Sequence, residues 1–328
     1  MRISLNSPVE INRDFTGYGG AGLNIFRSLT RLDHQVTLGD ETAPLRFNFM
    51  QPQHFIPNRR ATNILFFPWE STDISQQWQD ICNSDYVDHV WTTSPWCKKI
   101  FEDGGIEKPV YVYQHGVTSN WKPKKRKRKG PVKFLIVDAL ANRKGWQEAF
   151  DAFRAVFEDD PNKATLTIKS RDRSLIRWFD DRNFVKDPAT LPNVSINLKT
   201  LEEDELVRMF HDHDVLIYPS FGEGFGLIAH QFLATGGITI CTAEWAPYKD
   251  YLGDMALKST YIQSPWRGEH EGMVCKPDQS HLESLVSLAY TDFEDQSKQF
   301  YRRSFEYHEE YDWLELTRKA FDPVTKLF

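Results

Sequence analysis

A glycine-rich segment that follows a predicted strand carries the residues best suited to chemistry. The segment is Tyr218–Leu227, with the sequence YPSFGEGFGL. A strand ends at Tyr218 and a helix begins near Gly226, so free backbone N–H groups and the positive end of the helix dipole point to one place, which suits a diphosphate. The glycines let a ligand approach the backbone, and Glu223 can accept hydrogen bonds from sugar hydroxyls. The pattern predicts a site for a phosphorylated, hydroxyl-rich ligand.

The elements around this segment alternate between short β-rich apolar runs and longer helical patterns. Such alternation indicates parallel sheets with crossover helices, so both halves are predicted to be doubly wound α/β domains. The helix predicted over Trp146–Phe157 has an apolar stripe at three- and four-residue spacing, which marks a face packed on the second sheet. The predicted strands are Ile3–Leu5, Val36–Leu38, Ile64–Phe67, Val90–Thr92, Val110–Tyr113, Val132–Val137, Ala164–Ile168, Val194–Ile196, Val215–Tyr218 and Ile238–Cys241.

A basic segment bracketed by prolines separates the two halves. It runs from Lys124 to Lys129 and contains no core-forming side chain. Because adjacent like charges repel one another, we predict an extended, solvated linker, with a polyanion-binding patch as the alternative. The predicted organisation is an N-terminal Rossmann-like domain over 1–122, the linker over 123–131, a C-terminal Rossmann-like domain over 132–308, and a helix over 309–328 that returns toward the first domain.

The glycine-rich segment resembles the signature of a known family. Pro219–Ser220 and Glu223–Leu227 are similar to the motif of the large retaining GT-B glycosyltransferase family numbered four, the glycosyl transferases group 1. The resemblance implies the α/β GT-B fold, with two Rossmann-like domains facing a central cleft. It implies that the N-terminal domain binds the acceptor and that the C-terminal domain binds the nucleotide sugar. It also implies that a sugar moves from a nucleotide diphosphate sugar to an acceptor hydroxyl with retention of configuration, without a metal ion or other cofactor.

The same resemblance implies roles for the residues of this segment. Glu223 matches the glutamate beside the donor sugar, and Gln231 takes the position of a second glutamate that binds the nucleotide ribose. As a neutral amide, Gln231 should bind ribose more weakly than a carboxylate does. The implied contacts to the donor are Gly224, Phe225, Gly226 and Leu227.

An upstream motif supplies positive charge. Arg143–Lys144–Gly145 follows a predicted strand and resembles the Arg-Lys-Gly motif of the family. In the family the lysine neutralises the donor diphosphate and stabilises it as it leaves, which implies this role for Lys144. Many members have an arginine at the position of Asp138, so Arg143 or Lys169 would supply the second positive charge here.

Three segments of the first half resemble further family motifs. Phe15–Gly22 is similar to the first glycine loop, which faces the donor phosphates, and this implies donor contacts by Gly17 and Gly19. Glu70 lies in a Trp-Glu variant of another motif, and we predict that it faces the cleft because ligands bind at the carboxyl ends of parallel strands. His115 matches a family position at the end of the first domain, where it either caps a strand or takes part in the cleft and binds the donor.

Other interpretations remain open. Gly17–Gly22 also fits the glycine pattern of a nicotinamide-binding Rossmann domain, although it begins well after the first strand and lacks a clearly placed acidic partner. Asp212–His213–Asp214 contains the Asp-x-Asp pair of metal-dependent glycosyltransferases, but the pair precedes its strand and ends a helix, where carboxylates are unfavourable, so no metal site is predicted. Asp138 and Gln231 leave open a catalytically silent binding module of the same fold.

The sequence defines the donor better than the acceptor. One hypothesis is a small-molecule, lipid-linked or polysaccharide acceptor. The second is DNA with hydroxymethylated pyrimidine bases, as in phage-encoded enzymes. The second is motivated by the basic segment, Arg59, Arg60, Arg171, Arg173 and Arg177. The net charge of -6 and the pI near 6.0 count against a surface built for nucleic acid.

Length and composition agree with a folded two-domain protein. The chain has 328 residues, of which 40% are hydrophobic and 26% charged. Its four cysteines are scattered and match neither a disulfide framework nor a zinc site. No apolar run approaches the roughly 20 residues that span a bilayer. We therefore predict a cytoplasmic protein without a membrane span, in the host cytoplasm if it is phage-encoded.

Overall fold

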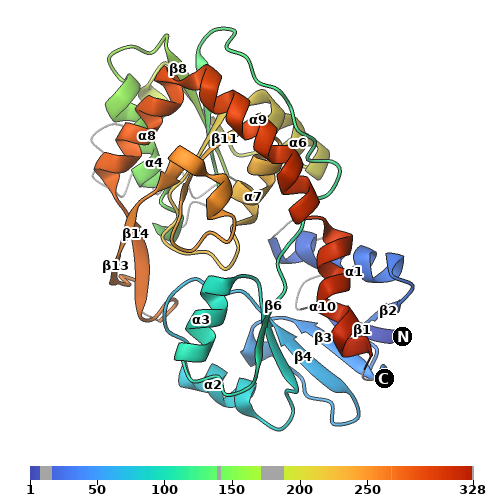
Figure 1. Ribbon diagram of the computed structural model, residues 1–328. Helices are drawn as coiled ribbons and strands as arrows, with labels where there is room; N and C mark the ends of the chain where they lie inside the picture. Colours follow the sequence, from blue (N-terminus) through green and yellow to red (C-terminus); the bar gives the residue numbers. More distant parts are fainter. Residues whose placement is uncertain (8–16, 139–141, 171–187, 267, 327–328) are drawn as a thin grey trace.

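Two α/β domains make up the molecule (Figure 1). The computed structural model describes residues 1–7, 17–138, 142–170, 188–266 and 268–326. Each domain is built on a six-stranded parallel sheet, so the predicted α/β fold is confirmed. Phe15, Thr16, Arg171, Arg173 and Arg177, which the sequence analysis singled out, lie outside the described residues.

The first sheet has the strand order β2-β1-β3-β4-β5-β6, and every neighbouring pair is parallel. Strand β3 (Leu45–Phe49) was not predicted, because Arg46 and Asn48 interrupt its apolar run. Both side chains are buried, and the amide of Asn48 donates to the backbone oxygen of Ile64 at 3.1 Å and accepts from Asn6 at 2.9 Å. The other elements are β1 (Arg2–Asn6), β2 (Gln35–Leu38), β4 (Thr62–Phe66), β5 (His89–Thr92), β6 (Val110–Val112), α1 (Gly17–Arg31), α2 (Gln76–Asn83) and α3 (Pro95–Asp103).

The second sheet has the strand order β12-β11-β10-β7-β8-β9, again with parallel neighbours. Helix α4 (Trp146–Phe157) packs on β7 and β10 through the predicted stripe, in which Trp146, Phe150 and Phe153 are each 1% exposed. The other elements are β7 (Val132–Val137), β8 (Ala164–Lys169), β9 (Val194–Asn197), β10 (Val215–Tyr218), β11 (Ile238–Thr242), β12 (Ala256–Leu257), α6 (Glu203–Asp212), α7 (Leu227–Ala234), α8 (Gln279–Thr291) and α9 (Phe293–Glu310).

A β-hairpin projects from the second domain and reaches the first near α3 (Figure 1). Strand β13 (Ser259–Gln263) pairs antiparallel with β14 (Met273–Pro277). The backbone N–H of Met273 donates to Oγ1 of Thr72 at 2.7 Å, and the backbone N–H of Thr72 donates to the oxygen of Met273 at 2.9 Å. Nε1 of Trp96 also donates to the hydroxyl of Tyr261 at 3.1 Å. We call residues 259–266 and 268–277 the interdomain arm, which the sequence analysis did not predict.

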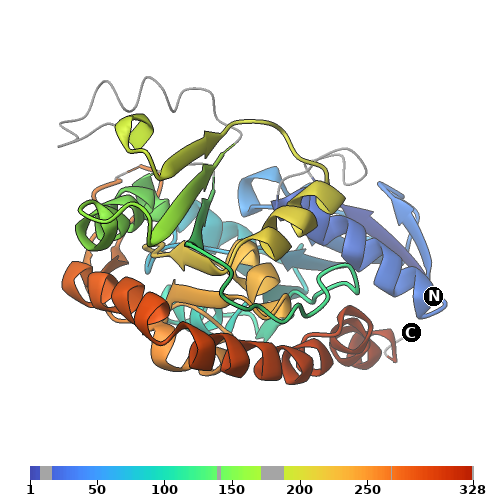
Figure 2. The same ribbon diagram turned by 90° about the horizontal axis from the view of Figure 1, so that it is seen from above.

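The C-terminal helix α10 (Trp313–Thr325) lies on the first domain, against α1 (Figures 1 and 2). Phe321 is fully buried there, and the hydroxyls of Tyr113 and Thr317 lie 2.7 Å apart. The chain therefore passes between the domains twice. The two passages are adjacent, because the backbone N–H of Val117 donates to the oxygen of Tyr311 at 2.8 Å.

The basic segment is anchored to the second domain. Arg126 is 5% exposed, and its guanidinium donates to the backbone oxygens of Phe210, His213 and Thr235 at 2.7 to 2.9 Å. These oxygens lie at the ends of α6 and α7, where a cation compensates the negative end of the helix dipole. The finding differs from the predicted solvated linker because Arg126 finds carbonyl acceptors far away in the sequence. Lys127 remains exposed.

Replacing Arg126 tests this anchoring. We expect Arg126→Ala to lower the free energy of unfolding by about 2 to 4 kcal/mol, because several buried carbonyls lose their charged donor. The matched control Lys127→Ala should stay within about 0.5 kcal/mol of the wild type. Urea unfolding followed by tryptophan fluorescence measures both values. Equal midpoints for the two variants would contradict the anchoring.

Candidate active site

One oxygen of a buried carboxylate, Oε1 of Glu223, is the centre of the site. Glu223 is 6% exposed and stands in the turn between β10 and α7. The hydroxyls of Ser220 and Tyr218 donate to Oε1 at 2.7 and 3.1 Å. Nζ of Lys144 lies 2.8 Å from the same oxygen, and a guanidinium nitrogen of Arg143 lies 3.3 Å away. The structure therefore brings three of the predicted catalytic residues together.

The two cations come from the turn after β7 and also contact other carboxylates. Lys144 lies 3.2 Å from Asp138, and Arg143 lies 3.6 Å from Glu70, which belongs to the first domain. Glu70 follows β4, so every member of the cluster stands beyond the carboxyl end of a parallel strand. This is the edge at which such folds bind ligands, and the fourth predicted catalytic residue, Glu70, is part of it.

Burial and ion pairing oppose each other in this cluster. Burial alone would raise the pKa of Glu223, but Lys144 and Arg143 outweigh it and lower this pKa to about 2. Burial would lower the pKa of Lys144, but Asp138 and Glu223 hold it above its ordinary value. For Glu70, burial dominates over Arg143 and raises the pKa. At neutral pH the central Glu223 is thus ionised and both cations are charged.

Glycines let the turn approach the backbone of the first domain. A Cβ on Gly222 would lie 2.0 Å from the backbone oxygen of Glu70, and one on Gly224 would lie 2.1 Å from Cβ of Pro68. The oxygen of Gly224 also accepts a hydrogen bond from Oγ1 of Thr93 at 2.7 Å. Gly226 has φ +78° and begins α7 beneath Trp245, where any side chain would clash. The glycines of this turn are therefore explained by the close contact between the domains as well as by close approach of a ligand to the backbone.

His115 packs among aromatic rings from both domains. Its ring centroid lies 6.0 Å from that of Phe66 and 5.0 Å from that of Phe225. Burial lowers the pKa of His115 to about 3, so its ring is neutral, and Nδ1 has no hydrogen-bond partner. The structure places His115 and Phe225 at the domain contact, and a role of either in donor binding stays a prediction.

The remaining predicted donor contacts gather around the start of α1. Gly17 and Gly19 belong to helix α1 (Gly17–Arg31), where the sequence analysis expected a loop. A Cβ on Gly17 would lie 3.5 Å from the side chain of Leu227, so α7 of the second domain touches α1 of the first. Gly19 is buried in the first turns of α1. Gln231 follows Leu227 by one helical turn and therefore lies on the same face of α7.

His270, which the sequence analysis missed, also belongs to the cluster. It lies on the interdomain arm with Nδ1 at 4.0 Å from Oε2 of Glu70, and its ring centroid is 5.3 Å from that of Trp69. Burial, followed by the charge of Arg143, lowers the pKa of His270 to about 4, so the imidazole is neutral at pH 7. No local motif marks this histidine, because the contact depends on how the arm meets the first domain.

Asp212 and Asp214, the Asp-x-Asp pair, lie at the opposite edge of the second sheet, where their carboxylates contact neighbouring residues. Asp212 ends α6, and its carboxylate lies 3.8 Å from Nζ of Lys124. Asp214 accepts from the backbone N–H of Lys133 at 3.0 Å. The ring of His213 contacts the oxygen of Met209 and the hydroxyl of Thr167. Within the described residues, no group of three acidic, His or Cys side chains is arranged to hold a metal ion.

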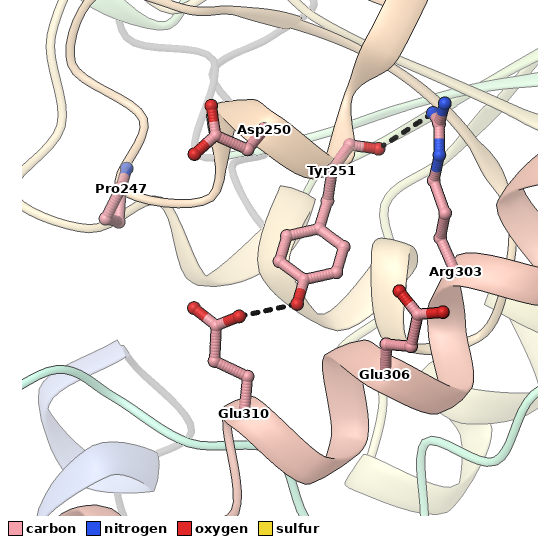
Figure 3. A pocket seen from close by; sticks show the side chains of 6 residues that line it. All are labelled: Pro247, Asp250, Tyr251, Arg303, Glu306 and Glu310. Atoms are coloured by element: carbon pink, nitrogen blue, oxygen red, sulfur yellow. Dashed lines mark hydrogen bonds between the residues drawn. The ribbon is translucent and has the colours of Figure 1, made fainter.

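A cavity of about 280 Å³ lies away from the charged cluster, between α9 and the loop after β11 (Figure 3). The carboxylates of Asp250, Glu306 and Glu310 line it, and Arg303 is its cation. The hydroxyl of Tyr251 donates to Glu310 at 2.5 Å. Because carboxylates predominate, this cavity is unsuited to a diphosphate, and the cluster around Glu223 is the better candidate site.

Comparisons with known proteins agree with the fold. Sucrose-phosphate synthase from Thermosynechococcus elongatus has a TM-score of 0.74 at 12% identity, over 100% of this chain and 99% of that one. A glycosyltransferase from Rickettsia africae has a TM-score of 0.70 at 12% identity, over 99% and 97% of the two chains. WaaG, a glycosyltransferase involved in lipopolysaccharide biosynthesis, has a TM-score of 0.66 at 13% identity, over 98% and 99%. At these identities the likeness establishes the fold.

These structures show that the chain has the two-domain GT-B fold. The family model of the glycosyl transferases group 1 matches residues 117–263, which include the second sheet and the first strand of the interdomain arm. Curated proteins provide no sequence match. In the described part of the chain, no helix has the length and apolar character needed to cross a membrane.

The close contact of Gly224 with Pro68 can be tested by adding one methyl group. In Gly224→Ala the new Cβ would force the domains apart, and we expect turnover to fall by about 100-fold, as for a misplacement of roughly 1 Å. Small-angle X-ray scattering should show a larger radius of gyration. The control is Gly20→Ala, in which the added methyl group meets no atom within 4 Å. Because alanine favours the helix over glycine, the free energy of unfolding of this variant should rise by up to about 1 kcal/mol. An unchanged scattering profile for Gly224→Ala would disprove the contact.

Acid titration tests the charge state of Glu223. Because its folded-state pKa is about 2, against an ordinary 4.5, its ionised form stabilises the fold above pH 4.5, and this stabilisation is lost as pH falls toward 2. We therefore expect the stability difference between wild type and Glu223→Gln to shrink as pH falls from 5 toward 2. Urea unfolding at each pH measures it. The control is Glu107→Gln at an exposed site. A pH-independent difference would show that Glu223 is not buried as an anion.

Proposed function

We propose that this protein is a glycosyltransferase that moves a sugar from a nucleotide diphosphate sugar to an acceptor hydroxyl, with retention of anomeric configuration and without a metal ion. The observation that carries the proposal is the sharing of one carboxylate oxygen of Glu223 by Lys144 at 2.8 Å and Arg143 at 3.3 Å. Two cations beside the start of α7 are suited to bind an anion such as a diphosphate.

The proposed roles follow from this geometry. Lys144 and Arg143 release Glu223 when the diphosphate binds, and they stabilise the negative charge that develops on it as it leaves. Glu223 then accepts hydrogen bonds from hydroxyls of the donor sugar. Because no enzymic nucleophile is needed, the remaining requirement is that the acceptor hydroxyl is held against the sugar carbon.

Other residues complete the proposed donor site. Gly17 and Gly19 lie across from α7 and face the phosphates, and Gln231 binds the ribose. The backbone from Gly224 to Leu227 contacts the sugar and phosphate. The side chains of Glu223, Arg143, Lys144 and Glu70 are only 8 to 22% exposed, so a nucleotide sugar reaches them when the domains separate and is enclosed when they close.

Metal independence is supported by the side chains that surround the cluster. The proposed charge on the leaving diphosphate comes from Lys144, Arg143 and the helix start, so no cation is required there. The Asp212–Asp214 pair lies at the other edge of the sheet, where its carboxylates contact Lys124 and a backbone N–H. A metal site at that pair would be far from the proposed leaving group in the fold.

For the acceptor, we favour the hydroxyl of a small molecule or a polysaccharide over modified DNA. The DNA hypothesis drew on the basic segment, but Arg126 is buried and Lys124 donates to the backbone oxygen of His211 at 2.6 Å. Arg126 and Lys124 are both anchored at the amino ends of the strands of the second sheet, whereas Glu223 lies at the opposite, carboxyl ends.

The intact cluster of Glu223, Arg143 and Lys144 favours an enzyme over a catalytically silent binding module. The four cysteines are free thiols, which agrees with the cytoplasm as the proposed location.

Donor hydrolysis tests this function. We expect one member of a panel of UDP-, GDP- and ADP-sugars to be hydrolysed and to raise the melting temperature, with no change on adding chelator. Lys144→Ala should lower kcat by about 100- to 1000-fold, the usual effect of removing one charge-stabilising donor. The matched control Lys127→Ala should keep the wild-type rate. Turnover that disappears with chelator would refute metal independence, and wild-type turnover by Lys144→Ala would refute the site.

The stereochemical course has its own test. Once a donor and an acceptor are known, NMR of the first product formed should show the anomeric configuration of the donor. Inversion would exclude the proposed mechanism, because it requires attack from the face opposite the leaving diphosphate.

A further inference from the structure

The interdomain arm places His270 beside the carboxylate of Glu70, but the two side chains form no hydrogen bond. Nδ1 of His270 is buried and has no hydrogen-bond partner. Oε2 of Glu70 lies 4.0 Å from this nitrogen, which is too long for a hydrogen bond. An uncompensated buried nitrogen is costly, and a polar pair at this separation accommodates a bridging oxygen.

The chemistry of the two groups defines what can bridge them. Glu70 presents a carboxylate oxygen, which accepts hydrogen bonds, and the neutral ring of His270 offers a nitrogen that donates or accepts according to its tautomer. A hydroxyl has one proton to donate and lone pairs to accept with, so it satisfies both groups at once. A phosphate oxygen has lone pairs but no proton to donate, so it satisfies fewer of these groups than a hydroxyl does.

The surroundings place this bridging position beside the proposed donor site. Arg143 contacts both Glu70 at 3.6 Å and Glu223 at 3.3 Å. The charges of Arg143, Glu223 and Lys144 all act on His270. A hydroxyl held between His270 and Glu70 therefore lies next to the cations proposed to bind the diphosphate.

We propose that His270 and Glu70 together bind one hydroxyl of the donor sugar, and that the interdomain arm forms this part of the site only when the domains are closed. The proposal rests on the proposed function, because it presumes a nucleotide sugar between Lys144 and Glu70. Closure is required because Glu70 belongs to the first domain and His270 to the second.

The arm is held to the first domain by contacts that fix its position. Met273 and Thr72 exchange the pair of hydrogen bonds described above, and Gly272, with φ +78°, approaches Thr72 so closely that a Cβ would lie 2.8 Å from its Oγ1. In the first strand of the arm, the hydroxyl of Tyr261 accepts a hydrogen bond from Nε1 of Trp96. Thr72 is thus a positioning residue, which acts on the sugar only through the arm.

The test separates the sugar from the nucleotide. Binding of UDP and UDP-glucose, GDP and GDP-mannose, and ADP and ADP-glucose is measured by calorimetry on the full chain, and the pair whose sugar nucleotide the wild type hydrolyses is used. In His270→Ala we expect the Kd of the sugar nucleotide to rise about tenfold, the value of a single hydrogen bond, and the Kd of the nucleoside diphosphate to change less than twofold. Thr72→Val should weaken sugar binding in the same direction.

Two further variants control for folding. His270→Asn places an amide where Nδ1 stands and should bind the sugar nucleotide within about threefold of the wild type, well inside the effect of the alanine variant. His54→Ala, at an exposed site, should leave both Kd values unchanged. Rescue by asparagine would not be expected if His270 served only to hold the arm.

The outcomes distinguish this proposal from the function on which it rests. If the wild type neither binds nor hydrolyses any donor, the proposed function fails and this proposal fails with it. If the wild type responds and His270→Ala keeps the wild-type Kd ratio between sugar nucleotide and nucleoside diphosphate, only the proposal is overturned. A loss of turnover at an unchanged ratio would also overturn it, because His270 would then act on something other than the donor sugar.

Discussion

A buried carboxylate that must remain charged governs the architecture of this protein. Glu223 is almost inaccessible to water, yet its pKa lies well below the ordinary value because Lys144 and Arg143 surround it. Removing a charge from water is costly unless cations and hydrogen bonds replace the solvent. Two different turns, after β7 and after β10, therefore have to meet at one point, and the parallel order of the second sheet brings them together.

The same constraint extends to the first domain. Arg143 has Glu70 as its other partner, so the charge balance of the cluster is complete only with the domains in contact. The backbone at Gly222 and Gly224 passes so near to Pro68 and Glu70 that no side chain fits there. Ion pairing and steric fit thus favour the same closed arrangement, and ligand binding has to compete with both.

Site residues that directly follow predicted strands could be predicted from the sequence, whereas residues whose contacts are remote in the sequence could not. Glu223 and the Arg143–Lys144 pair follow predicted strands, and parallel strands place such residues on one edge. His270 could not be found this way, because its approach to Glu70 depends on an arm that contacts residues some 200 positions earlier, as in the bond from Met273 to Thr72. Strand β3 was missed because Asn48 is polar but has partners in β1 and β4. Arg126 was taken for a solvated charge because its carbonyl acceptors are remote in sequence.

The two passages of the chain between the domains lie side by side, joined by the hydrogen bond from Val117 to Tyr311, and Gly116 leaves room for the backbone of Trp313. A rotation of the domains about these two adjacent passages would separate the opposite side of the molecule first. The interdomain arm lies on that side (Figure 1), so its hydrogen bonds with Thr72 and Trp96 are the contacts that such a rotation would break.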